Sequence, residues 1–504
     1  MRVTVALKPA DKAGLDSLIQ AQNTPGNPAY HQYLTPAQFN ARFAPSSAST
    51  SAVANYLASQ GFTNISTAAN RLSVTADGTA AAAQKAFNTS LGLFSQAGRT
   101  VLANLTPAQV PASLANTVSA VLGLNTISMT MPHVVKSAAG SPSLDGFYPK
   151  QFQQIYHAGN TKTGSATNIA VITEGDMTQT LKDLRTAEAK QKLPQVPVTV
   201  VRTGPASSDT AGTDEWDLDT QTSTGVAQTV KHLYLYDATT LDDADLYRAV
   251  SRFASDHIAK VGSASLGECD AQAYLDGALV ADDTVFEQAA VQGQTFFASS
   301  GDTGASCPVA PTNGVPLSGP IDTSYPASSP YVVGVGGTTL LADSSGNYIN
   351  EISWNAGGGG VSPVEVPGPW TANADPAYPV SSVSILGSGR GVPDVAADAD
   401  ANTGAQIYVN GQPEVIGGTS LSSPLWLGVM ARIESSHGNG IGFAAPLFYK
   451  LYDKANPSGS VSKVATPGFH DIQLGTNGLY PATPGYDFNT GIGTPDIAAL
   501  SAKL

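Results

Sequence analysis

The sequence predicts an α/β fold in which a parallel β-sheet carries helices on both faces, preceded by a small α+β unit. In the long C-terminal part, short apolar strands alternate with helix-like stretches, which is typical of a parallel sheet whose strands are joined by helices. The N-terminal part contains a smaller number of strand-like and helix-like segments than the C-terminal part. A stretch rich in Ser, Gly, Ala and Pro follows it. These observations predict two domains joined by an exposed linker.

The N-terminal unit starts with the strand-like VTVAL (3–7) and continues with helix-like residues 13–22 and 49–61. The stretch NRLSVTAD (70–77) predicts another strand. We therefore expect a first domain over residues 1–130, a linker over 131–146 that holds a cleavage site, and a second domain over 147–504.

The second domain contains the predicted parallel strands. A helical period covers residues 243–259 between two of them, and the apolar strands are 169–173, 196–201, 232–238, 260–267 and 295–301. Ligand sites of such sheets lie at the carboxyl ends of the strands. Glu174, Ser265 and Asp302 stand at or just past such ends, so we expect them near the site.

The charge of the chain is low and unevenly distributed. Charged residues make up 13% of the 504, against roughly a quarter in an average domain, so acid adds little self-repulsion and the composition suits low pH. Residues 1–132 carry seven Lys or Arg and three Asp, and the remainder has a net charge of −18. This asymmetry predicts that the two parts bind each other, and an acidic chain without a basic run excludes nucleic-acid binding.

Other features indicate an exported protein. Cys269 and Cys307 are its two cysteines, and they can form one disulfide. No stretch of 18 apolar residues is present, so we expect no membrane span. No signal peptide is visible either, so a secreted protein would have had its leader removed from this sequence.

The segment GGTSLSSPLWLGVMARIESS (417–436) predicts a tight turn leading into an apolar helix. Ser420 would lie at the helix N-terminus, where backbone N–H groups stabilise negative charge, and Pro424 suits a first helical turn. From this motif alone, Ser420 is either a nucleophile or a helix cap. A nucleophile needs a base, and none of the seven histidines occupies a suitable motif. His437, 17 residues along the same helix, would be roughly 25 Å away.

Carboxyl groups offer an alternative base. In TDEWDLDTQ, Glu215 and Asp219 are four residues apart and share one helix face. Two close carboxyls retain one proton between them, and a Glu base can act in acid, where His is protonated. A solvated acidic helix start explains the same residues. In FFASSGDTGASC, a protonated Asp302 could donate a hydrogen bond to an oxyanion, although Asp after Gly is also a common turn residue.

Together these motifs resemble the sedolisin (serine-carboxyl peptidase) family, which is similar to subtilisin in fold. The order of the motifs is that of the family: the ExxxD pair, then SGDxG (300–304), then GTSxxxP (418–424), with Gly417 where the family usually has Ser. The match covers nearly the whole chain. It implies a subtilisin-like domain and a ferredoxin-like activation prodomain, whose most specific stretch is NPAYHQYLTPAQFNARFAPS (27–46).

The resemblance implies a role for each residue. Ser420 would attack the peptide carbonyl, Glu215 would take its proton, Asp219 would tune Glu215, and Asp302 would stabilise the oxyanion. Glu174 matches a carboxylate that extends the proton network in some members. Ser265-Leu266-Gly267 resembles the strand that pairs with substrate backbone, and a buried sheet strand explains it equally well.

The resemblance also implies one Ca²⁺ ion in the C-terminal loop. Asp471 and Asp487 would supply carboxylates, and Ile472, Thr483 and Gly485 would supply backbone carbonyls. Thr483 stands where the family usually has Gly, which a backbone ligand tolerates if φ is negative. Without the resemblance, a Gly/Asn-rich turn cluster would explain these residues.

The expected protein is thus a monomeric, secreted, acid-active serine endopeptidase made as a zymogen, with proteins and peptides as substrates and its prodomain as inhibitor. Acid would weaken the attraction between the basic and acidic parts and start self-cleavage within 131–146. An inactive member that binds proteins is one rival. An aspartic peptidase using Asp219 and Asp302 is another, but only Asp302-Thr303-Gly304 fits that motif and the βα alternation disagrees with that fold.

Overall fold

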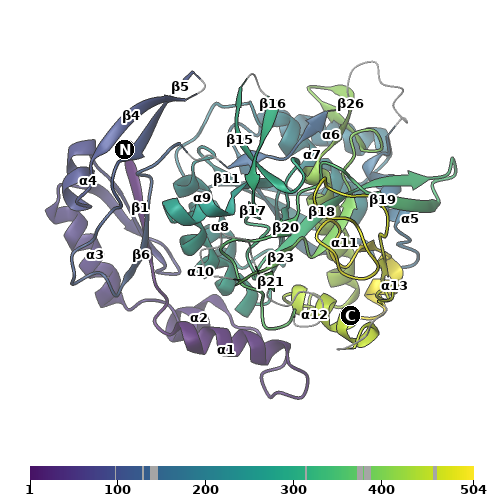
Figure 1. The fold of residues 1–504 in the computed structure, drawn as a ribbon, viewed down its shortest axis with the longest axis horizontal. Coiled ribbons are helices and arrows are strands. Elements are labelled where there is room, and N and C mark those ends of the chain that lie inside the picture. The colour runs from purple at the N-terminus through teal and green to yellow at the C-terminus, as the bar shows by residue number, and fades with distance from the viewer. Residues whose placement is uncertain are drawn as a thin grey trace.

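The N-terminal domain is an antiparallel sheet with short helices around it. The computed structural model describes residues 1–96, 98–127, 130–136, 146–312, 315–371, 378–379, 388–457 and 463–504. The sheet of the N-terminal domain has the order β2-β3-β1-β6, with β1 Arg2–Leu7, β2 Thr63–Thr67, β3 Ser73–Asp77 and β6 Val118–Leu122. The helices are α1 Lys12–Asn23, α2 Pro36–Arg42, α3 Ser47–Ser59 and α4 Ala80–Ala86, and the hairpin β4 Leu91–Gln96 and β5 Arg99–Asn104 extends from them (Figure 1).

Local sequence explains these elements. Thr35 caps α2 through a capping box with Gln38, and Pro36 occupies the first helical turn. The alternating apolar residues Val3 and Val5 of β1 face a separate core of this domain. The predicted strands and helices of this unit are all present.

The second domain is built on an eight-stranded sheet of order β10-β11-β9-β12-β14-β18-β19, with β24 pairing to β18. All of its pairs are parallel except β18–β19. The strands are β9 Gly164–Glu174, β10 Val198–Arg202, β11 Val230–Ala238, β12 Val261–Ala264, β14 Thr295–Ser299, β18 Val333–Ala342, β19 Tyr348–Ser353 and β24 Val395–Asp398. The prediction of a parallel α/β sheet is confirmed.

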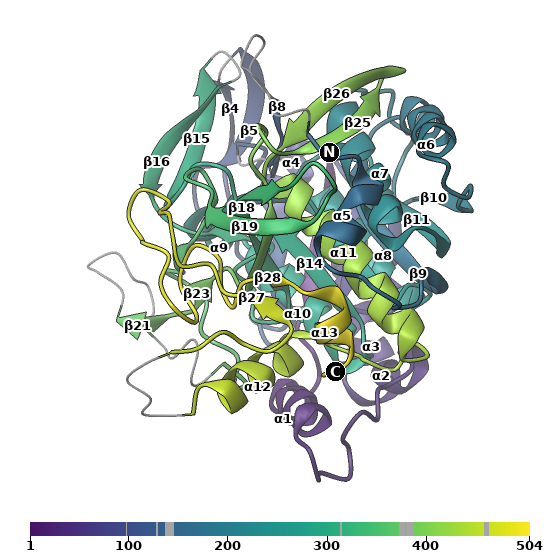
Figure 2. The ribbon, with the colours of Figure 1, turned by 90° about the vertical axis from the view of Figure 1, so that its right-hand side faces the viewer.

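Helices cover this sheet. α8 (Asp243–Asp256) and α10 (Ala278–Val291) pack together toward the N-terminal domain, and α7 (Thr213–Ala227) and α11 (Thr419–Ser436) pack together away from it (Figures 1 and 2). α11 crosses β9, β12, β14 and β24, and nearly all of its side chains are buried. The remaining helices are α5 Pro149–Ile155, α6 Thr178–Gln191, α9 Asp270–Asp276, α12 Ala445–Ala455 and α13 Ile497–Ser501.

Short strands surround the sheet. β13 (Leu266–Cys269) pairs with β17 (Ser324–Tyr325) and with β7 (Met131–Pro132) of the linker, while β8 (Val135–Lys136) pairs with β26 (Gln412–Gly417). The others are β15 Ser306–Thr312, β16 Val315–Ile321, β20 Gly360–Val361, β21 Tyr378–Pro379, β22 Ser388–Gly389, β23 Gly391–Val392, β25 Ala405–Val409, β27 Phe469–His470 and β28 Thr494–Pro495.

Two local details differ from the sequence-based expectation. The predicted strand 260–267 divides at Ser265, because the chain leaves the main sheet there and β13 pairs with other partners. Pro424 lies in the second turn of α11, since the helix begins at Thr419. Proline has no N–H for the carbonyl four residues earlier, and that carbonyl, Ser420 O, instead accepts a hydrogen bond from Ser265 Oγ at 3.2 Å.

The two domains share an extensive interface. α1 and β6 pack against α10, and neutral groups bond across it, including Gln22 to Val291 O at 3.0 Å and Asn70 to Gln288 at 2.9 Å. Within the described residues, Lys12–Glu287 (2.8 Å) is the ion pair that links α1 to α10. In the same residues no helix is long and apolar enough to cross a membrane.

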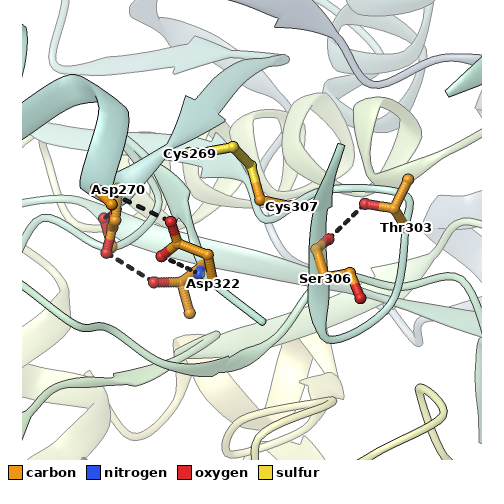
Figure 3. Close-up of a disulfide and its surroundings, with 9 residues drawn as sticks. Cys269, Asp270, Thr303, Ser306, Cys307 and Asp322 are labelled. Carbon is orange, nitrogen blue, oxygen red and sulfur yellow. Dashed lines mark hydrogen bonds between the residues drawn. A yellow bond between two sulfur atoms is a disulfide. The ribbon is translucent and has the colours of Figure 1, made fainter. Parts of the chain in front are cut away.

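A disulfide joins Cys269 at the end of β13 to Cys307 in β15 (Figure 3). Asp270, the next residue, accepts hydrogen bonds from Thr323, Ser328 and Ser362. The disulfide connects β13, the strand that follows Ser265, with β15, the strand that follows Asp302. It thus braces two walls of the site described below.

Candidate active site

Ser420 is the second residue of α11. Gly418 precedes the helix with φ of 98° and ψ of 164°, a conformation that side chains disfavour. The tight turn brings Ser420 to the helix N-terminus, as the sequence predicts. Its hydroxyl donates to Glu215 Oε2 at 2.8 Å.

Glu215 and Asp219 come from the first two turns of α7, and both are fully buried. Ser265 Oγ donates to Asp219 Oδ1 at 2.5 Å. Among the described residues, Glu215 Oε1 and Asp219 Oδ2 have no hydrogen-bond partner. Burial raises the pKa of both carboxyls well above the usual range, and the charge of Asp219 raises the pKa of Glu215 further. The pair can therefore retain a proton and still present a basic oxygen to Ser420.

Asp302 follows β14 on the other side of Ser420. Its Oδ1 accepts from the Thr419 backbone N–H and from Thr419 Oγ1, both at 2.8 Å. Burial raises the pKa of Asp302 to about 7. Since Oδ1 already accepts two hydrogen bonds, a proton on this carboxyl belongs on Oδ2, which has no partner among the described residues.

The linker passes through this site as an extended peptide. Met131 and Pro132 pair antiparallel with Gly267 and Leu266. The His133 N–H donates to Ser265 O at 3.3 Å, and the His133 carbonyl accepts from the Ser420 N–H at 3.1 Å. Beyond His133 the chain continues into β8 and pairs with β26.

The His133 carbonyl also lies beside Asp302. A Cβ on Gly418 would stand 2.1 Å from His133 O and 2.6 Å from Asp302 Oδ2. Only glycine leaves this space open, so the backbone, Ser420 and Asp302 can surround one carbonyl oxygen. The arrangement is that of an oxyanion hole.

The His133 side chain fills a buried pocket. Its Nδ1 lies 2.8 Å from Ser299 Oγ, and a Cβ on Gly267 would stand 2.5 Å from its Cε1. Burial lowers the pKa of His133 to about 4. The His133 ring therefore lies against a serine hydroxyl and the backbone of Gly267.

Among the described residues, no hydrogen bond joins Glu174 to the Glu215–Asp219 pair, whose carboxyls accept from Ser420 and Ser265. Burial and the charges of Asp209, Asp237 and Asp245 raise the pKa of Glu174 to about 7. None of those groups belongs to the pair, so a role for Glu174 in the proton network stays a prediction.

The residues predicted to bind calcium converge on one loop. Asp471 Oδ1 accepts from the Gly485 N–H at 2.9 Å, and Asp487 Oδ2 accepts from the Thr483 N–H at 3.0 Å. Burial raises the pKa of both carboxyls, that of Asp487 to about 6. Thr483 is not among the residues with positive φ, so its backbone does not require glycine. The two carboxylates are ligands of the kind that Ca²⁺ prefers, and the carbonyls of Ile472, Thr483 and Gly485 stay predicted ligands.

A serine hydroxyl bonded to a buried carboxyl, with a second carboxyl beside the substrate-like carbonyl, defines a serine-carboxyl peptidase. Comparison with known proteins agrees. The Pro-kumamolisin activation domain matches residues 1–127 and the Subtilase family matches residues 205–447. The chain belongs to the sedolisin family and is a serine peptidase with an activation prodomain.

The individual relatives span most of the chain. Sedolisin of Pseudomonas sp. (strain 101) is 39% identical over 100% of this chain and 86% of its own length. Kumamolisin of Bacillus sp. (strain MN-32) is 31% identical over 84% of the chain and 77% of its own length. The structure of Pseudomonas sedolisin complexed with two molecules of pseudo-iodotyrostatin has a TM-score of 0.63 at 39% identity, covering 71% of this chain and 97% of that one.

Sequence reasoning missed the part played by His133. It searched the histidines for a base, whereas the structure places His133 where a substrate residue would lie. A short extended segment that pairs with distant strands shows no hydrophobic periodicity in its sequence. The position of His133 in the predicted linker was therefore the one signal that could have indicated this role.

Proposed function

We propose that the protein is a secreted, acid-active endopeptidase, made as a zymogen that cleaves its own linker at the His133–Val134 bond. The observation that carries the proposal is the hydrogen bond from the Ser420 N–H to the His133 carbonyl, at 3.1 Å. It sets a peptide carbonyl beside a serine whose hydroxyl already donates to a carboxyl.

The reaction follows from these contacts. Ser420 Oγ attacks the His133 carbonyl carbon while its proton passes to Glu215, and Asp302 with the Ser420 N–H stabilises the oxyanion. The C–N bond then breaks, and Glu215 returns the proton to the Val134 amine. Water hydrolyses the ester on Ser420 and regenerates the hydroxyl. Asp219 tunes the base, because its charge raises the pKa of Glu215 and the pair titrates together.

Acid dependence follows from the carboxyl groups. Asp302 can donate to the oxyanion only while protonated, and its pKa of about 7 keeps it so in acid and not in base. The raised pKa values of Glu215 and Asp219 keep one proton on that pair. An imidazole base would lose its function in the same range.

The path of the linker supports cleavage within chains. Peptide extends to both sides of the scissile bond, through β7 toward the N-terminus and β8 toward the C-terminus, and each side pairs with a strand of the enzyme. Backbone pairing of this kind binds extended peptides with little demand on side chains. The intact linker leaves Ser420 fully buried, which explains inhibition of the precursor.

We further propose that one Ca²⁺ ion binds Asp471, Asp487 and the carbonyls of Ile472, Thr483 and Gly485. The ion would neutralise two carboxylates that are largely shielded from solvent and hold the C-terminal loop in place. The alternative of an inactive binding protein requires a defect in the nucleophile or its base, and the 2.8 Å contact between Ser420 and Glu215 argues against it.

The test is a time course of the purified precursor at about pH 4 and pH 7, with mass analysis of the first N-terminal fragment. We expect a fragment that ends at His133, formed faster in acid, and casein hydrolysis that follows it. The Ser420→Ala variant should fold and remain uncleaved. A first cut elsewhere would exclude His133–Val134, and unchanged activity of Ser420→Ala would exclude the proposed chemistry.

A further inference from the structure

A group of buried and partly buried carboxyls lies beside the substrate path. Asp243 begins α8, Glu268 lies in β13, and Asp276 ends α9. One carboxylate oxygen from each lies within 4.8 Å of the others. Asp282 of α10 lines the same cavity as Asp243 and Glu268.

Three of these carboxyls, those of Asp243, Glu268 and Asp282, lack the full set of partners that buried charges normally have. Asp243 and Glu268 are each 7% exposed, and Asp243 Oδ1, Glu268 Oε2 and Asp282 Oδ1 accept no hydrogen bond from the described residues. None of the ion pairs in the described residues includes these three. Burial and mutual repulsion raise the pKa of Asp243 and Glu268 well above the usual range.

Among the described residues, no Lys or Arg of the N-terminal domain forms an ion pair with these carboxyls. Residues 119–125 of that domain lie against Asp243 and Asp276, and that stretch, SAVLGLN, contains no Lys or Arg. The carboxyls are therefore not explained by recognition of the prodomain.

The substrate path leads directly to them. With His133 at the P1 position, the residue before the scissile bond, Thr130 stands at P4, three residues further toward the N-terminus. Thr130 is buried and lines the cavity that Asp243, Glu268 and Asp282 also line. The cavity has a volume of about 40 Å³, counted as the space that the centre of a water molecule can occupy. On this measure roughly 10–15 Å³ is enough to hold one water molecule. The short threonine thus leaves space beyond it.

Apart from the carboxyls, the cavity is lined largely by apolar side chains. Leu246, Val250 and Phe286 line it together with the carboxyls. Apolar walls that end at acidic groups suit a long side chain with an aliphatic stem and a cationic tip. Ca²⁺ prefers six to eight oxygen ligands, and these three apolar side chains add none to the oxygens of the carboxyls, so the test below includes a metal ion as a rival occupant.

We propose that Asp243, Glu268 and Asp282 form an acidic S4 subsite that binds a Lys or Arg side chain at P4 of the substrate. This rests on the proposed function, since it assumes that substrates follow the path of the linker. The cation would supply the partner that the unpaired oxygens lack. It would also compete with protons for the carboxyls, so the preference should strengthen as pH rises from about 3 to 6.

The test uses the processed enzyme and N-acetylated peptides that carry the linker sequence Met-Pro-His-Val-Val-Lys from P3 to P3′. P4 is Lys, Arg, norleucine or Glu. We expect kcat/KM for Lys and Arg to exceed that for norleucine by about 10- to 100-fold, as for a buried charged hydrogen bond, and Glu to be the poorest. Glu268→Gln should reduce this preference, whereas Glu434→Gln, which changes a buried carboxyl of α11 that is not among the residues lining this cavity, should retain it.

The outcomes separate the possibilities. Equal kcat/KM for all four peptides would overturn the acidic subsite while leaving the proposed function intact, and failure to cleave any of them between His and Val would count against the proposed function itself. A free peptide that begins at P3 and outperforms its acetylated form, without a P4 effect, would assign the carboxyls to an α-ammonium group. Loss of the Lys preference on adding Ca²⁺ or Zn²⁺, with tight binding of that ion, would assign them to a metal. Either result would overturn the proposal.

Discussion

Asp302 offers the sharpest test of the proposed chemistry. Its Oδ1 accepts two hydrogen bonds from Thr419, and its Oδ2 stands near the His133 carbonyl oxygen. Asp302→Ala removes the donor to the oxyanion, so we expect kcat to fall by about 10²- to 10³-fold, the usual cost of one such donor. Asp302→Asn keeps an acceptor for Thr419 and places an N–H group on the other side. Its kcat at about pH 4 should lie between those of the wild type and the alanine variant.

The pH dependence distinguishes a proton donor from a simple packing residue. Wild-type Asp302 loses its proton as pH rises through about 7, and the oxyanion contact is lost with it. The asparagine amide does not titrate, so the ratio of Asn-variant to wild-type kcat should increase across that range. The assay is hydrolysis of a chromogenic peptide from about pH 3 to 8, with the exposed Asp343→Asn as control. A ratio that stays constant with pH, or an alanine variant with wild-type kcat, would refute the reasoning.

The base, the docked linker and the calcium loop can each be probed separately. Glu215→Gln retains an acceptor for Ser420 but no base, so kcat should fall by about 10⁴- to 10⁶-fold, while thermal unfolding shows the fold intact; a loss below tenfold would contradict Glu215 as base. His133 is docked as the neutral imidazole, and its pKa of about 4 against about 6.5 when free means that docking weakens as pH falls through this range. This loss of docking opposes the acceleration of cleavage by acid, and His133→Phe removes it, so linker cleavage in this variant should accelerate more between about pH 6.5 and 4 than in the wild type, measured by gel time course; an unaltered profile would exclude this contribution. Chelation of Ca²⁺ should lower Tm by about 3 °C if the ion is present at 100 times its Kd, and Asp487→Asn should remove the effect of chelator; equal Tm with and without chelator in the wild type would exclude a stabilising ion.

The architecture was predictable from the sequence for identifiable reasons. The apolar strands 169–173, 232–238 and 295–301 are short, buried and separated by helical periods, so local pattern and tertiary structure agree there. The four-residue spacing of Glu215 and Asp219 likewise puts both side chains on one helix face through periodicity alone. The predicted ends of the strands were less accurate where pairing with other strands decides them. At Ser265, β12 ends and β13 begins, because the two segments pair with different strands.

The order of the domains, the parallel sheet and the residue types of the serine-carboxyl site could all be predicted from the sequence, because they depend on periodicity and on short motifs with fixed spacing. The folded chain was needed to show which carbonyl meets Ser420, and which carboxyl oxygens beside Thr130 accept no hydrogen bond. Those facts depend on segments more than a hundred residues apart: the His133 carbonyl accepts from the Ser420 N–H, and Thr130 lines one cavity together with Glu268. Nothing in the local sequence of either segment encodes the other, so the pairing arises only when the chain is folded.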